Sequence, residues 1–140
     1  MPVGEHRSTA TRRPGRVRDP VYSVLIGVAT LGVLLQALWA GLFVREGEEY
    51  RASWVHVHAI DGEVTILLAL LATIVAAVRM RRTRRDLVVG SAVFTVLLVV
   101  EAYLGGRIAD TAALTAVHFP LAMAIMALTV WLSLRAARRG

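Results

Sequence analysis

Two histidines and two carboxylates stand close together in the segment W-V-H-V-H-A-I-D-G-E, at the start of an otherwise apolar run. They are His56, His58, Asp61 and Glu63. A further histidine, His118, stands in a second apolar run, in the segment A-V-H-F-P-L-A. Imidazole and carboxylate groups ligate metals and transfer protons, and ionisable side chains inside a membrane segment are costly to bury and are functional by default. These residues are therefore the candidates for chemistry.

The helical positions of the first two histidines differ. His56 and His58 are two residues apart, so on a helix, at about 100° per residue, they lie on nearly opposite faces. At helical spacing His58 is followed by small residues, which allow another helix or a large ligand to come close; these are Gly62, Thr65, Ala69, Ala72 and Ala76. His56 is followed by mostly bulky residues, Ile60, Glu63, Leu67 and Ile74. We predict that His58 faces the interior, and that His56 reaches the membrane interface.

His58 and His118 share a local pattern. A small residue follows each of them four positions later, Gly62 in one case and Ala122 in the other. Both histidines lie about four to six residues from the outer end of their apolar runs, roughly 6–9 Å along a helix. Two imidazoles at one depth on separate helices can hold a flat macrocycle with iron at its centre, and the small residues give it room. Taken singly, each histidine is equally consistent with a hydrated interfacial side chain.

Three other polar residues in the apolar runs, Asp61, Glu101 and Gln36, each have two interpretations. Asp61 is one turn beyond His58 and is placed to orient an imidazole N–H, as carboxylates do for metal-bound histidines. It equally suits a solvated helix start, where acids are favoured by the helix dipole. Glu101 allows the same two interpretations. Gln36 lies in a stripe with Gly32 and Ala40, which predicts either close helix packing or a hydrogen bond across the bundle.

The composition indicates a membrane protein. Of the 140 residues, 56% are hydrophobic and the mean hydropathy is +0.61, whereas soluble domains are roughly 45–50% apolar. Four apolar runs are long enough to cross a bilayer, which takes about 20 helical residues; they are 21–44, 55–78, 87–104 and 112–134. Connections of about eight to ten residues make successive helices antiparallel neighbours. The predicted fold is an all-α integral membrane four-helix bundle at 21–140, after a disordered basic arm at 1–20.

The charges predict the topology. All sixteen basic residues are Arg, and thirteen lie in the arm, in the connection between the second and third runs, or at the C-terminus. The other two connections hold only Arg45, Arg51 and Arg107. By the positive-inside rule both termini are cytoplasmic, and the candidate histidines lie near the outer face. The net charge of +6 is therefore interpreted as topology rather than nucleic-acid binding. We expect a multi-pass protein of the cell membrane, the inner membrane in a bacterium.

This pattern resembles one four-helix half of haem A synthase, which has a histidine near the outer end of span two and another at the same level in span four. It also resembles small prokaryotic four-span membrane proteins with the motifs Q-x-x-x-A-G, H-x-x-x-G and V-H-F/P-x-x-A, which residues 36–41, 58–62 and 117–122 match. The resemblance implies that His58 and His118 are the axial ligands of a haem b. It also implies contacts to the cofactor from Gly62, Ala122 and Gln36.

The chain departs from haem A synthases at two features. Val55 stands where those enzymes have a glutamate, three residues before the histidine, and the chain has no cysteine for a pair in the first outer loop. We therefore expect electron transfer rather than haem hydroxylation. The expected partners are the lipid bilayer, either quinone or a respiratory complex, and a second copy of the chain.

Two other functions remain open at this stage. One is a cofactor-free accessory subunit, which packs its small-residue stripes against a larger membrane complex. The other is an outer-facing metal site or small transporter, built from His56, His58, His118, Asp61, Glu63 and Glu101.

Overall fold

The computed structural model describes residues 18–45 and 48–138, with side chains at 18–43 and 53–138. This part of the chain is helical and contains no strand. Its elements are α1 (Pro20–Arg45), α2 (Glu48–Arg79), α3 (Arg85–Arg107), the short 3₁₀ helix η1 (Ala112–Leu114) and α4 (Thr115–Ala137). The predicted all-α fold is confirmed, while nearly all of the arm predicted at 1–20 lies outside the described residues.

All four α-helices are long and apolar enough to cross a membrane. They also extend past the apolar runs, most clearly in α2, which begins at Glu48 rather than at position 55. Arg and Glu are good helix formers, so the helix continues through them. The connections are consequently shorter than expected, with only residues 46–47 between α1 and α2 and residues 80–84 between α2 and α3.

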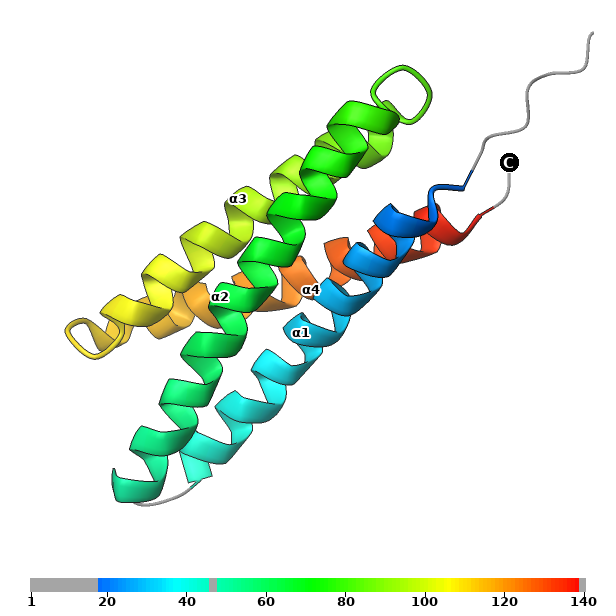
Figure 1. Cartoon of the computed structure of the whole chain (residues 1–140). Helices are drawn as coiled ribbons and strands as arrows, with labels where there is room; N and C mark the ends of the chain where they lie inside the picture. Colours follow the sequence, from blue (N-terminus) through cyan, green and yellow to red (C-terminus); the bar gives the residue numbers. More distant parts are fainter. Residues whose placement is uncertain (1–17, 46–47, 139–140) are drawn as a thin grey trace, which may run out of the picture.

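The helices form a four-helix bundle in which each one packs against two others. The contacting pairs are α1 with α2, α2 with α3, α3 with α4, and α4 with α1, and the first of these is the most extensive. Figure 1 shows the α2–α3 turn, the start of α1 and the end of α4 at one end of the molecule, and the end of α1, the start of α2 and the α3–α4 connection at the opposite end. Contacts between α1 and α4 therefore close the ring of helices.

Small side chains let α1 and α2 come close together. Gly32 of α1 faces Thr65 of α2, and a Cβ at Gly32 would overlap the Thr65 hydroxyl oxygen. The predicted inward stripe of α2 is buried from Thr65 onward, at Thr65, Ala69, Ala72 and Ala76. The opposite side of α2 is exposed, at Ile60, Val64, Leu67, Leu71 and Ile74. The helical phase predicted for the second span is confirmed.

Hydroxyl groups join the helices in the apolar interior. The Tyr22 and Ser91 hydroxyl oxygens lie 2.8 Å apart and link α1 to α3. Thr30 of α1 contacts the hydroxyls of Thr129 and Ser133 on α4, at 2.9 and 2.8 Å. Such bonds satisfy polar groups that lipid and packed side chains would leave unpaired.

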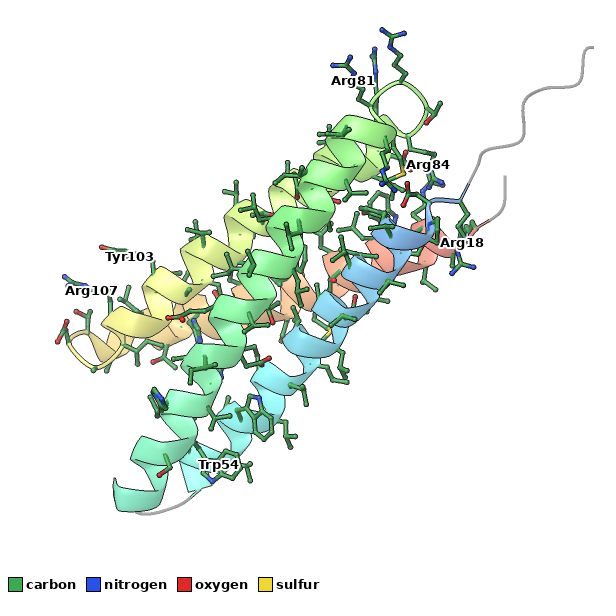
Figure 2. The ribbon with its side chains drawn as sticks, viewed as in Figure 1. Arg18, Trp54, Arg81, Arg84, Tyr103 and Arg107 are labelled. Carbon is green, nitrogen blue, oxygen red and sulfur yellow. The ribbon has the colours of Figure 1, made fainter. Side chains whose placement is uncertain are left out.

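Two arginines, Arg84 and Arg135, make polar contacts at the end of the bundle where the α2–α3 turn lies. Arg84 is 5% exposed and donates to the main-chain oxygen of Arg135 at 2.8 Å, which ties the turn to the end of α4. Asp86 lies between the two guanidinium groups, 3.4 Å from Arg84 and 2.9 Å from Arg135. Figure 2 shows Arg81 pointing away from the helices, in contrast to Arg84. Arg84, one of the thirteen arginines that predict the membrane topology, thus also has a structural role.

Candidate functional site

At the other end of the bundle, α1 and α2 are joined by a polar cluster of Gln36, His58 and Asp61. The Gln36 side-chain amide donates to the His58 main-chain oxygen at 2.8 Å and to an Asp61 carboxylate oxygen at 2.7 Å. His58 Nδ1 lies 3.1 Å from the Gln36 main-chain oxygen. The hydrogen bond that the sequence predicts for Gln36 across the bundle is therefore present, and it gives Asp61 a partner inside the protein.

This cluster determines which ring nitrogen of His58 is free. A carbonyl oxygen only accepts hydrogen bonds, so the contact with Gln36 assigns the proton to Nδ1 and leaves the lone pair on Nε2. The Phe43 ring meets the imidazole edge-on, with ring centroids 5.4 Å apart. A direct contact with the imidazole was one of the two interpretations of Asp61, the other being a solvated helix start. The structure instead pairs Asp61 with the Gln36 amide, while the Gln36 main chain contacts the ring.

A second polar pair, Glu101 of α3 and His118 of α4, lies on the facing helices. His118 Nδ1 is 3.0 Å from a Glu101 carboxylate oxygen, and the two side chains are 15% and 12% exposed. The contact is short but not aligned as a hydrogen bond, so both carboxylate oxygens and Nδ1 are buried without a hydrogen-bond partner. Among the interpretations of Glu101, the structure favours an oriented carboxylate beside a histidine over a solvated one.

His118 of α4 is close enough to His58 of α2 for a charge on its ring to act on His58. The His58 ring is held through Nδ1 by α1, and the His118 ring has its Nδ1 against the carboxylate on α3. In metal-binding histidines, a hydrogen-bond acceptor at one ring nitrogen fixes the tautomer and makes the other nitrogen a better ligand. His58 meets this condition, with Nε2 as its unprotonated nitrogen.

The small residues predicted beside the histidines are both partly buried. A Cβ at Gly62 would lie 3.7 Å from the Gln36 amide nitrogen, so the Gln36 side chain lies in the space that Gly62 leaves. Ala122 lies one turn beyond His118 on α4. The glycine that clears space for an imidazole is Gly105, where a Cβ would come within 3.1 Å of the His118 ring. The G-G sequence at 105–106 is the signal that could have identified it.

The remaining candidates lie outside this group. His56 and Glu63 are exposed on the outer side of α2, as the helical phase predicts for His56. Arg107 pairs with Asp110 at 3.8 Å, and Figure 2 shows it pointing away from the bundle beside Tyr103. In the part of the chain that the structure describes, no three His, Asp or Glu residues gather as a metal-ion site.

An aromatic pair closes the α1–α2 end of this region. The Trp39 and Trp54 rings stack with centroids 5.2 Å apart and planes at 11°. Tryptophan is enriched at membrane–water interfaces, so this stacked pair suits the end of a membrane-spanning helix pair.

Comparison with protein-family models, with curated proteins and with solved structures finds no match to this chain.

Proposed function

We propose that the chain is a haem-binding, b-type cytochrome-like membrane protein, in which His58 and His118 supply the two axial nitrogen ligands. The observation that carries the proposal is the matched environment of the two rings. Each ring has an oxygen close to Nδ1: the Gln36 carbonyl lies 3.1 Å from His58, and the Glu101 carboxylate lies 3.0 Å from His118. For His58 this contact leaves Nε2 for a ligand. Both carboxylate oxygens of Glu101 are buried without a hydrogen-bond partner among the described residues, which supports a site whose polar groups find their partners when a ligand binds.

The proposed activity is electron transfer. A haem iron with two imidazole ligands has no open position for a substrate and exchanges single electrons. The protein's own contribution would be to hold the two rings and to tune the iron. The Gln36 carbonyl holds the Nδ1 proton of His58, which makes that imidazole more basic, and the Glu101 carboxylate lies beside Nδ1 of His118. The apolar helices keep bulk water from the site.

The structure also weighs against the two alternatives. An accessory subunit would use its small-residue stripe against another protein, but the stripe from Thr65 to Ala76 is already buried inside this bundle. A six-residue metal or transport site requires His56 and Glu63 to join the others, and both are exposed on the outer side of α2.

The proposed topology is an antiparallel bundle with both termini cytoplasmic and the histidine site towards the outer face. The described Arg79, Arg81, Arg82 and Arg85 at the α2–α3 turn support it through the positive-inside rule. Quinone within the bilayer and an outer redox protein are the proposed partners, with a homodimer as the assembly. A C-terminal tag that an impermeant reagent labels only from the cytoplasmic side supports this orientation; labelling only from outside contradicts it.

The experiment is an absorption spectrum of detergent-purified protein expressed with ample haem, in the oxidised and reduced states. We expect a Soret band that is lost in His58→Ala and in His118→Ala, while His56→Ala, the matched control on the same helix, retains it. Membrane insertion of each variant is checked separately. A colourless wild-type protein contradicts haem binding, and loss of colour in His56→Ala alone contradicts the assignment of His58.

A further inference from the structure

A shallow groove between α3 and α4 lies near the α2–α3 turn, several helical turns from the histidines. Its lining is Arg85, Asp86, Val89, Gly90, Val93, Leu128 and Trp131, and the surface exposed within it is apolar. Gly90 forms the floor, because a Cβ there would lie 2.8 Å from Leu132 and 3.1 Å from the Trp131 ring. Helices α3 and α4 are therefore in contact beneath the groove, and the groove is open along its length on the surface above them.

The charge at the mouth of the groove is positive. Asp86 is already neutralised by Arg84 and Arg135, at 3.4 and 2.9 Å. Arg85 is exposed, and no carboxylate pairs with it among the described side chains. Trp131, which carries the Arg135 guanidinium 5.7 Å from its ring centroid, forms one wall. The groove thus combines an unneutralised cation at one end with an apolar track along the helices.

We infer that this groove binds one anionic glycerophospholipid, with its phosphate at Arg85 and an acyl chain along Val89, Val93 and Leu128. Charge complementarity selects the anionic headgroup, since basic pockets between membrane helices bind such lipids. The apolar track selects a lipid over free phosphate, which has no chain to bury. The groove opens on the lateral surface of helices that are long and apolar enough to span a membrane. This inference does not depend on haem binding.

The test is lipid retention by the purified full-length chain, measured by native mass spectrometry with phosphatidylglycerol and phosphatidylcholine of identical acyl chains. We expect the wild-type protein to retain phosphatidylglycerol preferentially. Arg85→Gln should weaken that retention about fivefold, the effect of one basic residue at an anionic lipid surface. Arg81→Gln is the matched control, because Arg81 is in the same turn but points away from the helices (Figure 2).

A second pair of variants tests the track. Val89 and Val96 are exposed valines on α3, at 62% and 61%, but only Val89 lines the groove. Val89→Trp should block retention of both lipids, while Val96→Trp should leave it unchanged. Equal retention of the two lipids by the wild-type protein overturns the inference, and so do equal effects within either pair. A protein dimer that Val89→Trp dissociates also overturns it, because the groove then belongs to a second copy.

Discussion

Gln36 and His58 bind each other twice: the Gln36 amide donates to the His58 main-chain oxygen at 2.8 Å, and His58 Nδ1 lies 3.1 Å from the Gln36 main-chain oxygen. The first contact fixes the rotation of α2 relative to α1, and the second fixes the rotation of the imidazole. One residue of α1 therefore determines both the register of the helix pair and the direction of the free ring nitrogen.

Gln36→Leu should lower the free energy of unfolding by roughly 1–3 kcal/mol, because it leaves the Asp61 carboxylate and the His58 carbonyl without their donor. Adding Asp61→Leu should recover part of the loss, since replacing both polar partners by apolar groups is less costly than orphaning one. Detergent unfolding followed by circular dichroism measures both. Leu38→Ala, at a position 51% exposed, is the control; a loss equal to that of Gln36→Leu contradicts a specific role for the amide.

Gly32→Ala should destabilise the protein by roughly 1–3 kcal/mol, because its Cβ would overlap the Thr65 hydroxyl in a closely packed helix pair. Thr65→Ala in the same chain should relieve the overlap. Gly27→Ala and Gly41→Ala are matched controls on α1, since a Cβ at either position meets nothing within 4 Å. Thermal unfolding in detergent reports the difference. Equal behaviour of all three glycine variants would mean that α1 and α2 are not this close.

Gly105→Val should disturb the His118 ring, because a Cβ at this position would already lie 3.1 Å from it. Overpacking of this kind costs roughly 1–3 kcal/mol, so haem retention should fall although both histidines remain. The adjacent Gly106→Val is the control, as a Cβ there meets nothing within 4 Å. The ring resonances of His118 in the haem-free protein provide a second measurement. If they shift equally in both variants, Gly105 has no particular relation to the ring.

Glu101→Gln should raise the midpoint potential of the bound haem by roughly 60 mV, the one-electron equivalent of a tenfold change in the equilibrium. A carboxylate beside a ligand favours the more positive, oxidised iron when it is ionised, and the amide removes that charge while keeping the size of the side chain. Asp110→Asn, on the exposed ion pair with Arg107, is the control. Spectroelectrochemical titration measures the shift. An unchanged midpoint potential in Glu101→Gln would mean that the Glu101 side chain has no electrostatic effect on the iron.

Arg84→Gln should cost roughly 2 kcal/mol of stability, because it removes charged hydrogen bonds to the Arg135 main-chain oxygen and to Asp86. Arg81→Gln removes the same charge from an exposed position in the same turn and should change stability by less than about 0.5 kcal/mol. Unfolding in detergent at matched salt distinguishes them. A similar loss in both variants would indicate an effect of net charge rather than of the buried contacts.

The sequence predicts the features that repeat along one helix. Four apolar runs predict four helices, and small residues at helical spacing from His58 predict the buried face of α2, because burial in a bundle requires closely packed helices. The outward position of His56 follows from the same periodicity. These signals are local, so a single chain displays them.

The contacts between helices could not be read in the same way. Gln36 is 25 residues from Asp61, and Glu101 is 17 residues from His118, so each pairing depends on the register of two helices that no local pattern specifies. The sequence shows Arg84 only as one of several predicted cytoplasmic charges. Its burial depends on a main-chain carbonyl at the end of α4, a contact that no local pattern displays. The proximity of Gly62 to the Gln36 amide, 3.7 Å from a Cβ at that glycine, depends on the same register.

The hydroxyl contacts have a consequence for how the helices enter the bilayer. Thr30 lies on α1, and its partners Thr129 and Ser133 lie on α4. Thr30 also donates to Ile26 within its own helix at 2.7 Å, and Thr73 likewise contacts Ala69 at 2.8 Å. Thr30 and Thr73 can therefore each enter lipid with the hydroxyl already paired to a carbonyl of its own helix. The contacts of Thr30 with α4 can then form when the two helices meet, without an unsatisfied Thr30 donor beforehand.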